Sequence, residues 1–171
     1  MPMSKVYLVD GSGYIFRAYY AIAPLSTKDG FPTNALYGYF RMLAKLLSQA
    51  ETDHMVMVFD TGEETFRHKL YDEYKANRDE CPTDLVQQMP YFRDIARAFG
   101  LKVLEQVGYE ADDIIGTLAT RLSNAKIETV IISGDKDLMQ LITDKVKIFD
   151  AMKDAWIGRD EVIKKFGVGP E

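Results

Sequence analysis

The stretch ETVIISGDKD occupies residues 128–137 of a 171-residue chain. Residues 128–133 are rich in β-branched side chains and apolar on both faces, which is typical of a central strand in a parallel sheet. Asp135 and Asp137 follow directly and predict a capped short helix. The stretch therefore predicts a buried parallel strand whose carboxyl end carries two acidic side chains.

The same arrangement recurs twice. Residues 6–9 form an apolar run before Asp10, and residues 55–59 form another before Asp60. Further strands are predicted at residues 102–104 and 146–149. The alternation of strands and helices predicts an α/β fold, with a mostly parallel central sheet flanked by helices. The predicted helices lie around residues 14–20, 34–47, 83–99, 111–122, 138–141 and 160–166.

Acidic residues crowd the strand ends and the start of one predicted helix, at residues 110–113. A helix cap explains Asp10 taken alone equally well, but one cap needs only one carboxylate. Because ligands bind outside the carboxyl ends of parallel strands, we expect these side chains to share one crevice. Oxygen ligands without Cys or His favour Mg²⁺ or Mn²⁺ over zinc. The candidate metal ligands are Asp10, Asp60, Glu110, Asp112, Asp113, Asp135 and Asp137.

Composition limits the class of protein. Hydrophobic residues make up 47% of the chain and charged residues 27%, as in an ordinary globular domain. The net charge of −5 says little about nucleic-acid binding, because the candidate ligands alone outweigh it. The lone cysteine, Cys81, excludes an intrachain disulfide and suits a reducing compartment. With no apolar signal-peptide core and no membrane-length apolar run, we expect a cytoplasmic protein without a membrane partner.

Residues 63–82 form a highly charged segment with few branched aliphatic side chains. This composition predicts a surface helix or a mobile insertion. A solvated face explains the charges equally well, because acidic residues partly neutralise them. Arg17 can face the same crevice as Asp10, although a lone arginine on an aromatic helix is more often a surface residue. The basic residues of the segment are Arg67, Lys69, Lys75 and Arg78.

Six motifs occur in order along the chain. They are Val9-Asp10-Gly11-Ser12, Val58-Phe59-Asp60, Phe66-Arg67, Tyr74-Lys75-Ala76-Asn77-Arg78, Glu110-Ala111-Asp112-Asp113 and Gly134-Asp135-Lys136-Asp137-Leu138. Together they closely resemble the 5′-nuclease domain of bacterial DNA polymerase I, a member of the flap endonuclease family with a PIN-like core. The resemblance covers essentially the whole chain, and the combination is specific although no single motif is.

The resemblance implies a divalent-metal-dependent 5′-3′ exonuclease or flap endonuclease that hydrolyses phosphodiester bonds in DNA. It implies that all seven carboxylates bind metal, with Mg²⁺ or Mn²⁺ in a two-metal site. Lys75 and Arg78 would be catalytic residues that reach the scissile phosphate from a helical arch at residues 63–82. Arg17 and Arg67 would be further DNA contacts.

The same resemblance implies partners and a location. The implied substrate is DNA with a 5′ flap, a nick or an RNA primer end, processed in replication and repair. A polymerase domain is expected in the same polypeptide, at the nucleoid of a bacterial cytoplasm, and the protein is expected to be a monomer.

One departure from the family pattern limits these expectations. In the family, a helix–turn–helix that grips duplex DNA and two further aspartates follow a segment like residues 167–170, whereas this sequence ends at Glu171. We therefore expect residues 1–171 to be the PIN-like core alone.

Three alternatives stay open: an inactive DNA-binding fragment, a PIN-like ribonuclease and a phosphoryl-transfer domain with an aspartyl nucleophile. A ribonuclease of this kind would need no basic segment. A phosphoryl-transfer domain would usually carry a second aspartate where Ser12 stands.

Overall fold

The structure is a computed structural model that describes residues 5–52, 54–71, 73–76 and 79–170. Among these residues, six strands form one sheet in the order β3-β2-β1-β4-β5-β6. Neighbouring strands are parallel except β5 and β6, which are antiparallel. The strands are β1 (Val6–Asp10), β2 (His54–Val58), β3 (Lys102–Leu104), β4 (Thr129–Ile132), β5 (Val146–Asp150) and β6 (Ala155–Ile157). The predicted α/β fold is confirmed, and the opening stretch contains a central strand.

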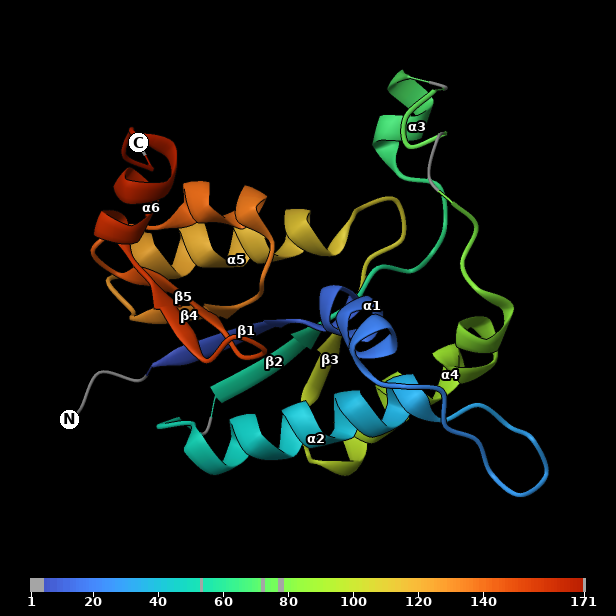
Figure 1. Ribbon diagram of the computed structural model, residues 1–171. Helices are drawn as coiled ribbons and strands as arrows, with labels where there is room; N and C mark the ends of the chain where they lie inside the picture. The colour runs from blue at the N-terminus through green and yellow to red at the C-terminus, as the bar shows by residue number, and fades with distance from the viewer. Residues whose placement is uncertain (1–4, 53, 72, 77–78, 171) are drawn as a thin grey trace.

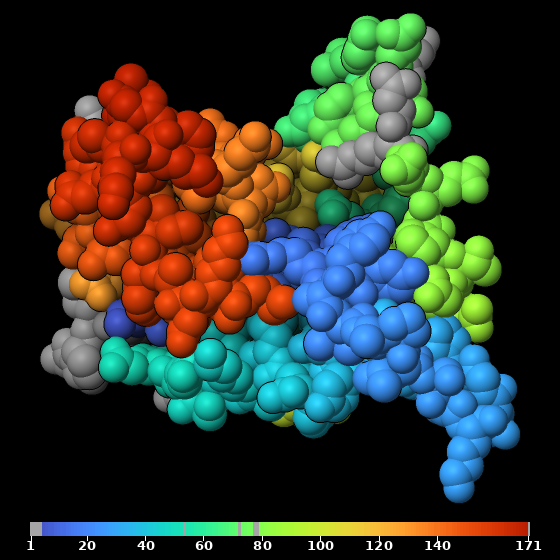
Figure 2. All heavy atoms as spheres, viewed as in Figure 1, coloured from blue at the N-terminus to red at the C-terminus, as the bar shows by residue number. Residues whose placement is uncertain are grey.

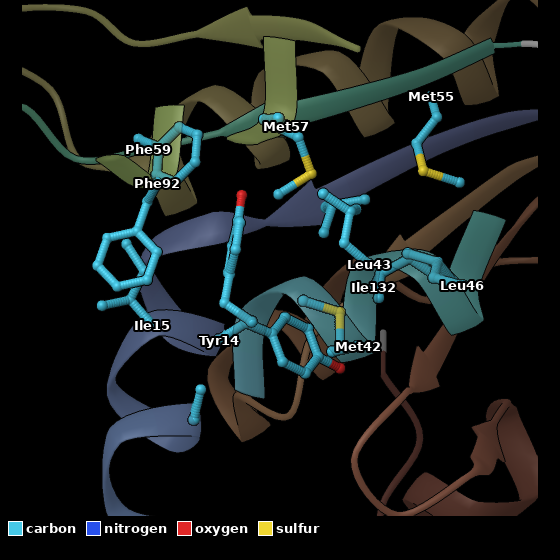
Figure 3. Packing of buried hydrophobic residues seen from close by; sticks show 14 of the residues in the cluster. Tyr14, Ile15, Met42, Leu43, Leu46, Met55, Met57, Phe59, Phe92 and Ile132 are labelled. Carbon is cyan, nitrogen blue, oxygen red and sulfur yellow. The ribbon is translucent and has the colours of Figure 1, made fainter. Parts of the chain in front are cut away.

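Helices cover both faces of the sheet (Figure 1). Side chains alternate along β1, so Tyr7 and Val9 enter one core cluster and Leu8 enters the other. The first cluster packs the sheet against α1, α2 and α4, and Figure 3 shows Tyr14 of α1, Met42 of α2 and Phe92 of α4 converging there. The second cluster packs it against α5, η1 and α6.

The helix bounds agree closely with the predicted segments. The helices are α1 (Gly11–Ala21), α2 (Asn34–Gln49), α3 (Phe66–Leu70), α4 (Thr83–Ala98), α5 (Ala111–Asn124), the 3-10 helix η1 (Lys136–Leu141) and α6 (Arg159–Phe166). No helix among the described residues is both long and apolar enough to cross a membrane.

Two features differ from the sequence-based expectation. The sequence does not predict β6, because the strand–helix alternation that predicts the parallel strands does not extend to a strand that follows β5 through a short turn and pairs with it antiparallel. In the described part of residues 63–82, the expected surface helix is limited to the five residues of α3. Figures 1 and 2 show α3 projecting from the body, and Figure 2 shows a hollow between this projection and the C-terminal part of the chain.

The carboxyl ends of β1, β2 and β4 meet at one edge of the sheet. Strand β1 lies between the other two, with Asp10 opposite Val58 and Val9 opposite Ile132. Asp60 and Asp135 lie just beyond the ends of β2 and β4. The fold therefore brings acidic residues that are far apart in sequence to one place, as the strand pattern predicts.

Candidate active site

Asp10 is the only buried candidate ligand among the described residues, with 5% of its surface exposed. Its Oδ1 accepts a hydrogen bond from the backbone N–H of Gly13 (2.8 Å), and its Oδ2 accepts one from the hydroxyl of Ser133 (2.8 Å). Glycine at position 13 allows this close approach, because a Cβ there would lie 2.2 Å from Asp10 Oδ2 and the Asp10 side chain would have to shift. Burial raises the pKa of Asp10 despite these bonds, and the carboxylates of Asp60 and Asp135 raise it further.

Asp60 is exposed, yet three helices fix its position. Its backbone N–H donates to Oγ of Ser12 in α1 at 2.8 Å, and its carbonyl accepts a hydrogen bond from Arg93 of α4 at 2.8 Å. Its Oδ1 accepts the backbone N–H of Ala111 at 2.7 Å. Ala111 begins α5, so the Asp60 carboxylate lies at a helix N-terminus, where the helix dipole favours negative charge.

Asp112 has no partner among the described residues that would offset its charge. Burial raises its pKa from the usual 3.8 to about 7, and neighbouring negative charges add to the effect. A shift of this size indicates that the ionised group lacks compensation and marks a candidate functional site. The contributing carboxylates, in decreasing order, are those of Asp10, Asp135, Asp60 and Glu110.

Asp113, the next residue, is paired with the basic segment. Arg67 of α3 donates hydrogen bonds of 2.7 and 2.6 Å to its two carboxylate oxygens. Its Oδ2 also accepts the backbone N–H of Glu110 at 2.9 Å. The Arg67 guanidinium therefore holds the pKa of Asp113 below its usual value.

Glu110 contacts three side chains of the same segment. Lys75 donates to its Oε1, the Tyr74 hydroxyl donates to its Oε2 at 3.2 Å, and Arg67 Nη1 lies 3.7 Å from Oε2. Lys75 has a φ of 59°, a conformation that residues other than glycine rarely adopt. The basic segment is thus turned onto the acidic start of α5. Arg78, the other predicted catalytic residue, lies outside the described residues.

Asp135 and Asp137 are both exposed at the start of η1. Asp135 Oδ1 accepts the backbone N–H of Asp137 at 2.8 Å, and its own N–H donates to Ser133 Oγ at 3.0 Å. Since the same hydroxyl donates to Asp10, Ser133 links the ends of β1 and β4. Asp135 is one of the carboxylates that raise the pKa of Asp112. Asp137 is not among them, and it lines a different hollow together with Phe166.

Arg17 lies at the carboxyl edge but is paired with Asp150, the last residue of β5. Two hydrogen bonds of 2.9 and 3.2 Å join its guanidinium to that carboxylate, which is almost fully buried. The guanidinium covers Gly134, where a Cβ would lie 1.9 Å from Arg17 Nη1. Arg17 therefore lies over the residue that precedes Asp135 and is held there by Asp150.

Sequence reasoning missed four residues that support the site. Asp150 follows an apolar strand just as Asp10 does, so the same pattern could have found it. Ser12 and Ser133 each lie within two residues of a predicted ligand, but a serine near an aspartate is only a weak indication of a supporting role. No sequence pattern indicates the role of Arg93, because its partners come from distant parts of the chain.

The donor chemistry of the site fits a hard divalent cation. Every candidate ligand is a carboxylate, and neighbouring negative charges add to burial in raising the pKa values of Asp10 and Asp112. In the part of the chain that the structure describes, no three His, Cys, Asp or Glu side chains are arranged so that they could hold a metal ion. The carboxylates therefore lie near one another but are not drawn together as ligands of one ion.

Similarity to known proteins shows the family of this chain. Residues 5–167 match a family model described as 5'-3' exonuclease, N-terminal resolvase-like domain. The chain belongs to this family. A 5'-3' exonuclease of Aquifex aeolicus (strain VF5) is 42% identical over 169 residues, which cover 99% of this chain and 58% of that protein.

A second relative in sequence is much larger than this chain. A DNA polymerase I of Rhizobium leguminosarum is 47% identical over 174 residues, which cover 97% of this chain but only 17% of that protein. A bacteriophage T5 flap endonuclease, solved in a pseudo-enzyme–product complex with DNA and metal ions, has a TM-score of 0.68 and 22% identity. That match covers 96% of this chain and 61% of the phage chain, and at this identity it shows the fold alone.

Proposed function

We propose that this chain is the core of a divalent-metal-dependent 5′-3′ exonuclease or flap endonuclease that hydrolyses phosphodiester bonds in DNA. The observation that carries the proposal is the gathering of carboxylates at the carboxyl edge of the sheet, which contributes to a pKa of about 7 at Asp112. A basic segment lies directly against this acidic group, as a site for an anionic substrate requires.

A bound Mg²⁺ or Mn²⁺ pair would supply an activated water and charge neutralisation at the phosphate. The chain would hold it with carboxylate oxygens. Backbone N–H groups already orient Asp10 and Asp60, and the second oxygen of Asp10 also accepts the Ser133 hydroxyl. The proposed ligands are Asp10, Asp60, Glu110, Asp112, Asp113, Asp135 and Asp137.

The basic residues would bind the scissile phosphate. Lys75 now neutralises Glu110, and once a cation takes over that role its ammonium group is available for a phosphate oxygen. Arg67 would exchange Asp113 for phosphate in the same way. We propose that Arg78 acts beside Lys75, and that Arg17 contacts a further phosphate from its position over Gly134.

The proposal extends to the biological setting. The chain spans 58% of the Aquifex protein and 17% of the Rhizobium protein, so activities of the whole polypeptide are inferred from relatives. We propose that the substrate is DNA with a 5′ flap, a nick or an RNA primer end, and that a polymerase domain belongs to the same polypeptide. The proposed location is the nucleoid of a bacterial cytoplasm, and the proposed state is a monomer.

Cleavage of a labelled 5′-flap DNA in the presence of Mn²⁺ tests the proposal. We expect the wild-type chain to cut the flap, and we expect the Asp112→Asn/Asp113→Asn variant to lose this activity. Asp94→Asn is a matched control, because Asp94 lies on the exposed face of α4. Unchanged cleavage by the double variant would contradict the assignment.

Two other results would favour the alternatives. Flap binding by the wild-type chain without cleavage would favour a DNA-binding fragment. Cutting of single-stranded RNA, with flap DNA left intact, would favour a PIN-like ribonuclease.

A further inference from the structure

Arg93 of α4 joins three parts of the structure beneath the site. Its Nε donates to Oε2 of Glu105 at 2.6 Å, and its Nη2 donates to the backbone carbonyl of Asp60 at 2.8 Å. Its guanidinium carbon lies 4.9 Å from the ring centroid of Phe59, which is almost fully buried. The Arg93 side chain is only 23% exposed, so both polar contacts and the ring contact hold it against the protein.

We propose that Arg93 is a positioning residue that fixes the turn carrying Asp60 and thereby sets the affinity of the site for its metal. This inference deepens the proposed function and depends on Asp60 being a metal ligand. Arg93 touches the backbone of Asp60, not its carboxylate, so it would act through the placement of that residue.

The chain that follows Asp60 does not hold it in place. Residues 62–64 are exposed, and Gly62 has a φ of 78°, which marks a sharp turn in an open loop. Outside β2, the orientation of Asp60 depends on the hydrogen bond that its N–H donates to Ser12 and on those that it accepts from Arg93 and Ala111. Arg93 is the only one of the three that contacts Asp60 through a long side chain, and it belongs to α4.

An arginine suits this role better than a lysine. The planar guanidinium directs separate N–H groups to a carboxylate and to a carbonyl while its face lies over Phe59. A lysine ammonium group keeps the charge but not this fixed fork. Comparing Arg93→Lys with Arg93→Met therefore separates the geometric role from the effect of a positive charge.

Mn²⁺ binding, measured by electron paramagnetic resonance on the metal-free chain, tests the inference without measuring activity. We expect Arg93→Met to weaken Mn²⁺ binding about tenfold or more, which is the usual range for residues that orient metal ligands. Arg93→Lys should restore little of this loss. Glu105→Gln should weaken binding in the same direction by less, because it loosens Arg93 without removing it.

Arg97→Met is the matched control. Arg97 lies about one turn further along α4, its side chain is 56% exposed, and it pairs with Asp94 on the surface. The control removes the same charge from the same helix and should leave the Mn²⁺ affinity unchanged. If Arg93→Met does not fold, as judged by its urea unfolding curve, Arg93→Lys and Glu105→Gln provide the same comparison.

A double variant separates this inference from the proposed function. If Arg93 acts through Asp60, then Asp60→Asn/Arg93→Met binds Mn²⁺ no more weakly than Asp60→Asn alone. Additive losses would overturn the inference, as would an Arg93→Met chain with wild-type Mn²⁺ affinity and a raised KM for flap DNA. If Asp60→Asn alone leaves Mn²⁺ binding unchanged, the failure belongs to the proposed metal site and the premise of the inference is lost with it.

Discussion

Asp112 and Asp113 are adjacent carboxylates on the first turn of α5, but their surroundings are opposite. Burial and neighbouring carboxylates raise the pKa of Asp112 to about 7, whereas the Arg67 guanidinium lowers that of Asp113. The same contrast divides the whole acidic edge. We call Glu110 and Asp113, which bind Lys75 and Arg67, the paired carboxylates. The unpaired carboxylates, which have no ion pair among the described residues, are Asp10, Asp60, Asp112, Asp135 and Asp137.

This difference shows how one edge can be both stable and reactive. The paired carboxylates dock the basic segment and so contribute to stability. The unpaired carboxylates repel one another, and this repulsion is free energy that a divalent cation can recover on binding. The following changes test whether the two groups differ in this way.

The largest expected effect is the loss of the Arg67 contact. Arg67→Met leaves Asp113 and Glu110 half-buried without this partner, so we expect a loss of about 2–3 kcal/mol in the free energy of unfolding at neutral pH. A lowered pKa stabilises the fold above the unfolded-state pKa, and this contribution is lost as the pH falls through the folded value. The deficit should therefore shrink below about pH 4, the range in which a free carboxyl group titrates.

Urea unfolding at several pH values measures this deficit. Arg97→Met, which removes an exposed arginine, is the control. A deficit of the same size at acid and neutral pH would show that Arg67 acts by packing and not through its ion pair.

Asp112→Asn should have the opposite sign. With a folded pKa of about 7 against a usual value of 3.8, the carboxyl group is harder to ionise in the folded chain, so the metal-free wild type loses stability as the pH rises between these values. Asparagine cannot ionise. We therefore expect the variant to be more stable than the wild type by about 1–2 kcal/mol above pH 7, a figure reduced for partial solvent exposure.

Thermal unfolding in EDTA across pH 4–8 checks this prediction. The advantage of the variant should grow up to about pH 7, the folded pKa of Asp112, and then level off. Asp113→Asn is the natural comparison and should destabilise the chain at neutral pH. If both variants shift stability in the same direction, the division into paired and unpaired carboxylates is wrong.

The sequence predicts the unpaired carboxylates better than it predicts the residues that hydrogen-bond to them. An aspartate directly after an apolar strand is a local pattern, and parallel strands carry such residues to one edge whatever their separation in sequence. That logic places Asp10, Asp60 and Asp135 correctly at the edge of the sheet. Their partners cannot be predicted in this way, because Ser133 and Arg93 meet them only after distant elements have packed together.

The basic segment shows a second limit of the sequence. Its charges predict a surface element, and the family resemblance implies a role near phosphate, but neither indicates that Arg67 and Lys75 pair with carboxylates. Pairing depends on the path of residues 63–76 over the start of α5, which no periodic pattern encodes. Likewise, β6 follows β5 through a short turn and lies outside the strand–helix alternation that predicts the parallel strands.

Ser133→Ala should have an intermediate effect within the unpaired group. The fully buried hydroxyl donates to Asp10 and accepts the N–H of Asp135, so its removal leaves two polar groups without this partner. We expect a loss of about 1 kcal/mol in unfolding free energy, measured by urea denaturation. Ser48→Ala, at an exposed position on α2, should change stability much less. Equal losses for the two variants would argue against the bridging role.

Lys75→Met should have the smallest effect and makes the sharpest distinction between the two groups. The Lys75 ammonium group and the Glu110 carboxylate are both partly exposed, so in EDTA their ion pair should contribute about 0.5 kcal/mol. Lys69→Met is the control, because Lys69 is an exposed lysine on the same segment. The stability difference between these two variants isolates the Glu110 contact from the general loss of a positive charge.

The effect of Mg²⁺ on the ion pair between Lys75 and Glu110 tests whether the lysine is released when a cation binds. If a cation takes over the neutralisation of Glu110, Lys75 is released, and the difference between Lys75→Met and Lys69→Met should vanish at saturating Mg²⁺. Thermal unfolding with and without Mg²⁺ measures it. A difference that persists at saturation would mean that Lys75 stays bound to Glu110 beside the metal. Lys75 would then be a structural partner of the acidic edge, unable to leave it for a phosphate.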